Sequence, residues 1–267
     1  MKKICVWVLV LALLMVSGLS IAEDASVEAI LSKGTLVLGL DDSFPPMGYR
    51  NEAGEIVGFD IDLAEEVAAR LGVTLEKQPI DWAAKELELA AKNIDCIWNG
   101  MSITPDREES MSMTFSYMNN EIVFYILEDS GLTTLESLAG KKVAVQNGSY
   151  AEELINNEDN AALKATLGEV LGFDEYLTAL MDLEQGGVDA VLIDKVVAEF
   201  RIASMGTNKI VPSAALKDDN YGVGFRKEDV ALRDQVESIL IEMKKDGKLG
   251  EISTQWFGSD ISCVPAE

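Results

Sequence analysis

Short apolar segments alternate with amphipathic segments along most of the 267 residues. Each apolar segment has the length of a strand and is followed by a Gly or Asp turn and then by apolar residues at helical spacing. Strands that alternate with helices predict an α/β fold with parallel sheets covered on both faces. The predicted strands cover residues 35–40, 73–76, 94–98, 122–126, 142–145, 188–193 and 222–225.

Capping residues and glycines mark where the helices begin and end. Asp62 and Glu65 have the spacing of a capping box, and Gly72 ends the helix that they begin. Apolar residues at positions 64, 67, 68 and 71 form one face of that helix. Further helices are predicted after the pairs Thr133 with Glu136 and Ser149 with Glu152, over residues 232–243, and over residues 249–256.

The N-terminal 22 residues have the pattern of a secretory signal. Two lysines precede an apolar run over residues 4–16, and Ser20 and Ala22 provide the small side chains that a signal peptidase requires. The run is too short to span a bilayer comfortably. We therefore expect residues 1–22 to be a signal peptide cleaved after Ala22, with a retained signal anchor as the alternative. The mature protein would be periplasmic or extracellular.

Composition excludes several classes of function. With 46 acidic against 22 basic residues the net charge is −24, which disfavours binding to nucleic acid and to anionic membranes. The absence of histidine excludes Ser-His-Asp and HExxH chemistry. The chain also contains no phosphate loop, GxGxxG fingerprint, EF-hand or CxxC motif, so we expect no cofactor and no metal. Any ATP hydrolysis that the protein serves would belong to another subunit.

Cysteine use is compatible with either a disulfide or free thiols. Cys96 and Cys263 remain after removal of the signal and could form one disulfide in an oxidising compartment. Cys96 lies in an apolar run, however, where a free cysteine packs as a small hydrophobe. The length suits one large domain or two ordinary ones, and no low-complexity linker separates two halves.

Polar residues follow several predicted strands, at the edge where open α/β sheets bind ligands. Asp41 follows the first strand, Gly100, Ser102 and Arg107 follow the third, and Asp194 follows the strand over residues 188–193. Because the carboxyl ends of parallel strands share one edge of a sheet, these residues are expected to face a common crevice.

Arg107 is the main candidate for binding an anion. Thr104 is placed to cap a helix with Pro105 at its first position, so Arg107 falls in the first helical turn. Its guanidinium could bind a carboxylate through two hydrogen bonds. The alternative is a surface ion pair with Glu108 or Glu109.

Two further polar segments complete the candidate site. Ser149 and Tyr150 open a helix whose free backbone N–H groups suit an anion, although Ser149 is explained equally well as a helix cap. Asp194 could accept from an ammonium group or act as a helix cap. A ligand with a carboxylate and an ammonium group would satisfy Arg107 and Asp194 together, which indicates an α-amino acid. Phe44 and Trp82 could flank its side chain or belong to the core.

Several ordered segments of the sequence resemble a known family. The run GFDIDLAEEVA over residues 58–68 closely resembles the signature of the polar amino-acid-binding proteins of bacterial ABC importers, the family-3 extracellular solute-binding proteins. The resemblance covers nearly the whole mature chain. It includes residues 41–46, 94–107, 145–149, 188–194, 222–226 and 256–258.

The resemblance implies a periplasmic-binding-protein fold of type II, in which two α/β lobes are joined by two hinge strands. Lobe 1 would be discontinuous and comprise residues 23–121 and 218–267. Lobe 2 would comprise residues 122–217. The chain would cross between the lobes near residues 119–122 and 217–221.

The resemblance also implies roles for individual residues. The arginine that matches Arg107 takes the ligand α-carboxylate, with help from the positions of Ser102 and Tyr150. The α-ammonium meets the positions of Gly100, Ser102 and Asp194. The side chain of the ligand is met by the positions of Asp41, Phe44 and Trp82.

Two departures from the family pattern affect specificity. Tyr150 stands where many relatives have Thr or Ser, so only its backbone N–H carries over. Asn99 and Gly100 stand where binders of basic amino acids often have two serines, although Gly100 still offers a backbone carbonyl.

The sequence thus predicts a monomeric receptor that closes around one polar L-amino acid and delivers it to a membrane permease with a separate ATPase subunit. Asp41 and the acidic surface make a basic amino acid the leading candidate, with glutamine-like and cystine-like ligands open. A rival hypothesis is an enzyme on the same scaffold, of the cyclohexadienyl-dehydratase type. Another is the ligand-binding part of a sensor, which would need a membrane segment after Cys263.

Overall fold

The computed structural model describes residues 24–266, and nine strands within this range form one sheet. Its strands are β1 (Thr35–Leu40), β5 (Thr74–Pro79), β6 (Cys96–Ser102), β7 (Met111–Met113), β8 (Met118–Leu127), β9 (Lys142–Gln146), β10 (Glu169–Phe173), β11 (Ala190–Asp194) and β12 (Ile210–Arg226). Their order is β10-β9-β11-β8-β12-β6-β1-β5, and β7 pairs with β12. The predicted signal peptide lies outside the described residues.

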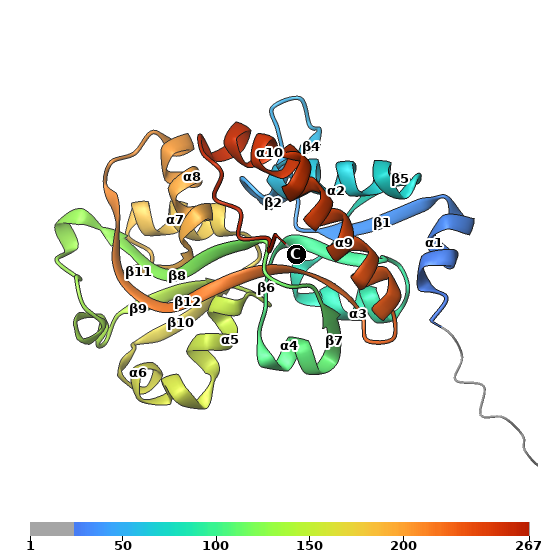
Figure 1. Cartoon of the computed structure of the whole chain (residues 1–267). Helices are drawn as coiled ribbons and strands as arrows, with labels where there is room; N and C mark the ends of the chain where they lie inside the picture. The colour runs from blue at the N-terminus through green and yellow to red at the C-terminus, as the bar shows by residue number, and fades with distance from the viewer. Residues whose placement is uncertain (1–23, 267) are drawn as a thin grey trace, which may run out of the picture.

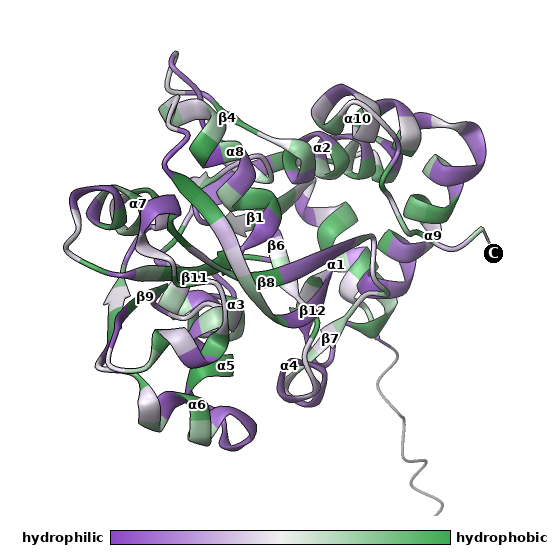
Figure 2. Ribbon diagram, turned by 90° about the vertical axis from the view of Figure 1, so that its left-hand side faces the viewer, coloured by the Kyte–Doolittle hydropathy of each residue, from purple (hydrophilic) through white to green (hydrophobic). Residues whose placement is uncertain are grey.

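Helices cover this sheet, and a small second sheet lies beside it. The helices are α1 (Ser26–Lys33), α2 (Phe59–Leu71), α3 (Lys85–Ala90), α4 (Pro105–Ser110), α5 (Tyr150–Asn156), α6 (Ala161–Thr166), α7 (Tyr176–Gln185), α8 (Lys195–Met205), α9 (Val230–Asp246) and α10 (Lys248–Phe257). The short strands β2 (Ser43–Phe44), β3 (Gly48–Arg50) and β4 (Ile56–Val57) form the second sheet. Figure 2 shows hydrophobic segments along the central strands and hydrophilic segments in the outer loops.

The large sheet has two α/β halves joined by two long strands. In Figure 1, β9, β10 and β11 with α5–α8 lie on the left, β1 and β5 with α1–α3 lie on the right, and β8 and β12 run between them. Strands within each half are parallel, as in the pairs β1–β5 and β9–β10, whereas β8 and β12 run antiparallel to each other and to their neighbours. The predicted α/β class with two connecting strands is confirmed, and the sheet is mixed rather than purely parallel.

β8 and β12 pair along nearly their whole length. The register runs from Ile210 opposite Leu127 to Tyr221 opposite Met118. The strand predicted over residues 222–225 is therefore only the end of β12, because the polar residues before it hide its strand character in the sequence. The short strands β2, β3, β4 and β7 and the strand β10 gave no signal that we recognised.

The helix boundaries correct two of the predicted caps. α2 begins at Phe59 directly after Gly58, so Asp62 is not its cap, and the Asp62 carboxylate accepts from Trp256 Nε1 at 2.8 Å. The second capping box is formed by Thr134 with Ser137, and it opens a short 3₁₀ helix rather than an α-helix. The second error arises because Thr133 with Glu136 offers the same spacing one residue earlier, whereas α2 begins after Gly58 without any side-chain cap.

Other helix signals are confirmed. Gly72 and Gly247 adopt left-handed φ angles at the ends of α2 and α9, as the sequence predicts. Ser149 Oγ accepts from Glu152 N at 3.2 Å and caps α5.

The two cysteines do not form a disulfide. Cys96 is fully buried in β6, and Cys263 contacts Ser116 Oγ at 3.2 Å. Burial raises the pKa of the Cys96 thiol well above its usual range. Cys96 therefore packs as a small, unreactive hydrophobe.

Gly58 is required where the chain enters α2. Its φ is 150°, and a Cβ there would lie 2.1 Å from the carbonyl oxygen of Met47. We expect Gly58→Ala to lower the free energy of unfolding by about 2 kcal/mol or more. Gly54→Ala is the matched control, because Gly54 has a φ of 80° but open space around it, and it should cost only about 1 kcal/mol. Equal melting temperatures for the two variants would contradict this account.

Candidate functional site

Polar residues from both halves converge where the parallel strands end. Asp41 follows β1, Ser102 ends β6, Gln146 ends β9 and Asp194 ends β11. All four are buried. The structure thus brings Asp41, Ser102 and Asp194 to one region together with Gln146, which opens the predicted polar segment over residues 146–150 but was not among the expected ligand contacts.

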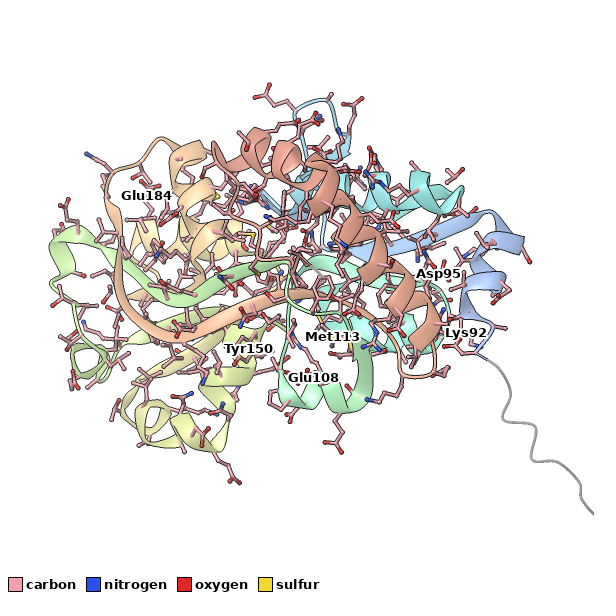
Figure 3. All side chains as sticks on the ribbon, in the orientation of Figure 1. Lys92, Asp95, Glu108, Met113, Tyr150 and Glu184 are labelled. Atoms are coloured by element: carbon pink, nitrogen blue, oxygen red, sulfur yellow. The ribbon has the colours of Figure 1, made fainter. Side chains whose placement is uncertain are left out.

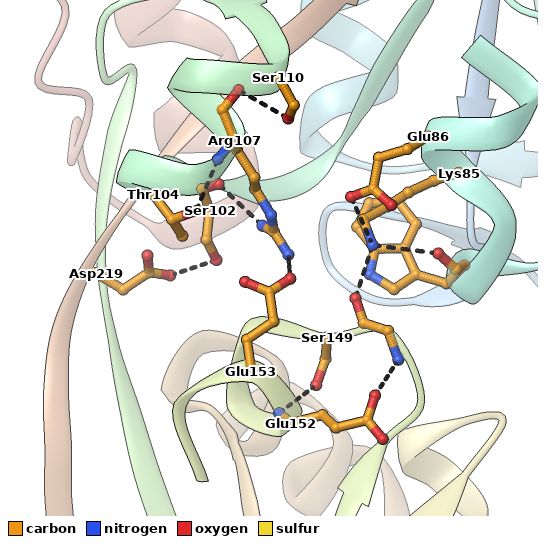
Figure 4. A network of polar contacts seen from close by, with 12 residues as sticks. Lys85, Glu86, Ser102, Thr104, Arg107, Ser110, Ser149, Glu152, Glu153 and Asp219 are labelled. Atoms are coloured by element: carbon orange, nitrogen blue, oxygen red, sulfur yellow. Dashed lines mark hydrogen bonds and ion pairs between the residues drawn. The ribbon is translucent and has the colours of Figure 1, made fainter. Parts of the chain in front are cut away.

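Arg107 is buried and crosses between the two halves. Thr104 Oγ1 accepts from Arg107 N at 3.3 Å and caps α4, as predicted. The guanidinium turns inward, where Nη1 donates to the carbonyl of Ser102 at 2.9 Å and Nη2 pairs with Glu153 of α5 (Figure 4). The alternative, a surface ion pair with Glu108 or Glu109, is not formed, because Arg107 is buried and pairs with Glu153.

Asp194 belongs to a hydrogen-bonded cluster that includes both connecting strands. Its Oδ1 accepts from Asn120 Nδ2 at 2.8 Å and from the Tyr221 hydroxyl at 2.6 Å. Asn120 also donates to Asp219, which accepts from Ser102 Oγ at 3.0 Å. Burial and the charge of Asp219 raise the pKa of Asp194 to about 7. Asp194 precedes α8 but makes no side-chain cap, so its carboxylate faces this cluster instead.

Asp41 forms a second cluster across the two halves. Its Oδ1 accepts from the backbone N–H and the hydroxyl of Ser43, and its Oδ2 accepts from Gln146 Nε2 at 2.6 Å. Arg201 of α8 donates to the carbonyl of Ser43 at 2.6 Å. Burial raises the pKa of Asp41 and lowers that of Arg201, although the negative charge of Asp41 opposes the second shift.

Lys85 places a second buried cation beside Arg107. Its side chain is 2% exposed, and Nζ donates to the carbonyl of Gly148 at 2.7 Å across the two halves. The ammonium also lies 5.2 Å from the ring centre of Trp82 and 3.5 Å from Glu86 (Figure 4). Burial and the charge of Arg107 lower the pKa of Lys85. Trp82 thus contacts a cation of the protein.

The segment at the end of β6 is shaped by Gly100. Gly100 has a φ of 60°, its N–H donates to Asp60 Oδ2 at 2.7 Å, and a Cβ would lie 2.6 Å from the ring of Phe44. Phe44 is therefore packed closely against this backbone. The Asn99 amide is turned away and accepts from the N–H of Gly48 at 3.0 Å in its favourable orientation, so it holds the β2–β3 turn.

Tyr150 lies at the edge of this region and is partly exposed. It lines a groove of about 550 Å³ together with Thr104, Asp106 and Lys217, and Figure 3 shows it beside α4. Ser149 is buried and caps α5, so its hydroxyl is already used as a backbone acceptor.

Several buried polar atoms between the halves have no hydrogen-bond partner among the described residues. The donors are Arg107 Nε, Arg201 Nε and the Tyr176 hydroxyl, and the acceptors are Asn120 Oδ1, Gln146 Oε1 and Asp219 Oδ1. Leaving a buried polar atom unpaired costs about 1–3 kcal/mol. A small molecule with both donor and acceptor groups would satisfy this set.

Several residues of this region were not recognised from the sequence. They are Lys85, Asn120, Glu153, Arg201 and Asp219. Most lie in helices or strands, where a polar residue normally faces solvent. One signal was present for Asn120, because polar residues 119–121 interrupt an otherwise apolar strand.

Two features are absent from the described part of the chain. No group of three or more Cys, Asp or Glu side chains is arranged to hold a metal ion between residues 24 and 266. Over the same range, no helix has the length and apolarity needed to cross a bilayer.

Most of the chain is similar to proteins whose names describe them as solute-binding. The profile of the bacterial extracellular solute-binding proteins, family 3, matches residues 36–259. The L-cystine-binding protein TcyJ of Escherichia coli K12 is 28% identical, with 95% of each chain covered. The histidine-binding periplasmic protein of the same strain is 31% identical, covering 84% of this chain and 88% of that protein.

A solved structure gives the same result for the fold. It is an ABC uptake transporter substrate-binding protein from Streptococcus pneumoniae with bound histidine, with a TM-score of 0.86 and 36% identity. The match covers 90% of this chain and 99% of that one. The fold is therefore that of the type II periplasmic binding proteins.

Asp60 accepts a hydrogen bond from the backbone of Gly100 and should make the stability of the protein depend on pH. Its Oδ2 accepts from Gly100 N and from the Tyr117 hydroxyl at 2.8 Å, and burial raises its pKa to about 7. Because the folded state binds this proton more tightly than the unfolded state does, the stability from Asp60 is greatest below about pH 4 and falls as the pH rises to 7.

We expect Asp60→Asn to remove this dependence, because the amide resembles the protonated acid. Between pH 4 and pH 8, the free energy of unfolding of the variant should rise relative to that of wild type by on the order of a few kcal/mol. Its melting temperature should therefore also rise relative to that of wild type over this range. A constant difference in melting temperature between variant and wild type from pH 4 to pH 8 would show that Asp60 does not titrate in this range.

Proposed function

The chain belongs to the family 3 bacterial extracellular solute-binding proteins, and we propose that it is an extracytoplasmic receptor that binds a polar L-amino acid and delivers it to the permease of an ABC importer. The supporting observation is that a buried cation, Arg107, and a buried anion, Asp194, approach one region from opposite halves of the sheet. The unpaired donors and acceptors around them match a zwitterion.

We propose that the two halves are lobes that open about β8 and β12. Lobe 1 comprises residues 23–121 and 218–267, and lobe 2 comprises residues 122–217. The side-chain hydrogen bonds and ion pairs described above that join the lobes are Arg107 with Glu153, Asp41 with Gln146, Arg201 with Ser43, Lys85 with Gly148, and Asp194 with both Asn120 and Tyr221. Such contacts can exchange for water when the lobes part, which suits an open–closed equilibrium that a ligand shifts.

The main-chain groups of the amino acid would bind at the two buried charges. The α-carboxylate would meet Arg107 and the backbone N–H of Tyr150, while the α-ammonium would meet Asp194 and the carbonyl of Gly100. Asp219 supports this assignment because its Oδ1 has no partner among the described residues and could accept a further ammonium hydrogen. Ser102 then acts by holding Asp219.

The side chain of the ligand would extend toward Asp41, between Phe44 and Trp82. Asp41 and the unpaired Oε1 of Gln146 are both acceptors, so this end favours a side chain that donates hydrogen bonds. A basic side chain is the leading candidate. The nearby guanidinium of Arg201 reduces the negative field, so imidazole and amide side chains also fit.

The relatives distinguish a receptor from an enzyme on this scaffold. The matched proteins are binding proteins, so the chain is a solute-binding receptor and not an enzyme of the dehydratase type. We further propose that residues 1–22 direct export and that the receptor acts as a monomer. Its partner would be a permease with a separate ATPase subunit.

Binding is tested by a thermal-shift screen of amino acids on the mature protein, with arginine, histidine, glutamine, cystine and glutamate as probes. At about 100 times Kd a ligand adds about 2.7 kcal/mol, which should raise Tm by at least about 5 °C. We expect Arg107→Ala to abolish the shift, because it removes the cation for the α-carboxylate. Arg50→Ala, which removes an exposed guanidinium paired with Asp42, is the control and should bind normally. Wild-type-like binding by Arg107→Ala would refute the role of Arg107.

The affinity for the amino acid should depend on pH through Asp194. Its pKa of about 7 means that it is partly protonated in the empty protein at neutral pH, whereas an ammonium ligand requires its ionised form. Binding should therefore release protons, and affinity should fall by up to about tenfold per pH unit between pH 7 and pH 5. Calorimetry in buffers of different ionisation enthalpy measures both effects. Constant affinity over this range would remove Asp194 from the ammonium site.

A further inference from the structure

The ion pair between Arg107 and Glu153 joins the two lobes through the group that should hold the ligand. We propose that Glu153 is an internal competitor for the ligand's α-carboxylate, which occupies Arg107 in the empty closed protein and must be displaced on binding. The inference rests on the proposed function, and it adds an affinity-determining residue that contacts the ligand-binding arginine rather than the ligand.

The geometry places the Glu153 carboxylate where a ligand carboxylate would bind. Arg107 Nη1 is used by the Ser102 carbonyl, Nη2 is used by Glu153, and Nε has no partner among the described residues. A bidentate carboxylate needs two adjacent N–H groups of the guanidinium, which here are those of Nε and Nη2. Glu153 already pairs with Nη2, so its carboxylate competes with a ligand carboxylate for this edge of the guanidinium.

Glu153 can leave at low cost. Its side chain is 41% exposed, whereas that of Arg107 is 4% exposed, so the carboxylate can turn back to water but the guanidinium cannot. Glu153 lies on α5 in lobe 2 and Arg107 on α4 in lobe 1, so their pairing also requires the lobes to be closed. In Figure 4 the Glu153 carboxylate lies below the Arg107 guanidinium.

The charges around Arg107 explain why the protein places a carboxylate beside it when no ligand is bound. Lys85 is buried close enough to Arg107 for the charge of Arg107 to lower the pKa of Lys85. Two buried cations with no anion at Arg107 would repel each other in a poorly solvated region. Glu153 neutralises this pair until a ligand brings its own carboxylate.

The proposal predicts tighter binding when the competitor is weakened. Glu153→Gln should bind the best ligand of the thermal screen about tenfold more tightly than wild type, as measured by calorimetry. The reason is that Arg107 no longer has to lose an ion pair with Glu153 before it can bind the ligand carboxylate. Glu153→Asp keeps the charge but shortens the side chain, so it should also bind more tightly. Glu158→Gln makes the same charge change on the same groove and should stay within about twofold of wild type.

Unchanged or weaker binding by both Glu153 variants would overturn the proposal, because Glu153 would then be a bystander or a ligand contact. A gain shared equally with Glu158→Gln would also overturn it, since the effect would come from net charge alone.

Solution scattering of the empty protein provides a readout that needs no ligand. Without the Arg107–Glu153 pair the lobes lose one closing contact, so Glu153→Gln should have a larger radius of gyration than wild type and Glu158→Gln should not. An unchanged radius for Glu153→Gln would overturn the proposal. If wild type binds no amino acid, the proposed function fails while this measurement still tests the Glu153 contact.

Discussion

A buried guanidinium must have an anion beside it, and this requirement organises the space between the lobes. Arg107 is held inward by the cap of α4 and by the carbonyl of Ser102, so it cannot turn to water when the lobes are closed. A closed state of the proposed lobes would therefore be favoured by a carboxylate at Arg107, supplied by Glu153 or by a ligand. Under this proposal, lobe closure would be linked to occupancy of the site and would favour ligands that carry a carboxylate.

The connecting strands take part in the site as well as joining the lobes. Asn120 on β8 and Asp219 on β12 lie opposite each other in the register, and both contact the Asp194 cluster. Because this part of the sheet is where the chain passes between lobes, rotation of one lobe changes the geometry around Asp194 directly. If the proposed lobes move, the connecting strands would thus carry the effect of ligand binding on Asp194 directly to that movement.

The sequence predicted what depends on local chemistry and missed what depends on distant pairing. The capping of α4 by Thr104 and the end of α2 at Gly72 follow from residues within a few positions, and both are confirmed. The partners of Arg107 and Asp41 could not be predicted, because Glu153 and Gln146 reach them across the space between the lobes. Even Trp82, predicted as a ligand contact, lies over Lys85, and periodicity gave no sign of this buried cation.

The carboxylate and the ammonium group of a zwitterion would contribute to binding at this site in different ways. The proposed ligand carboxylate would replace the hydrogen bond of Glu153 to Nη2 of Arg107 and would add a second one to the unpaired Nε. At the other end, burial raises the pKa of both Asp194 and Asp219, and the charge of Asp219 raises that of Asp194 further. An ammonium group relieves this repulsion and pairs with the unpaired oxygen of Asp219. In the proposed complex, the ammonium end would therefore add a cation beside two buried carboxylates, whereas the carboxylate end would replace an anion that the protein already provides at Arg107.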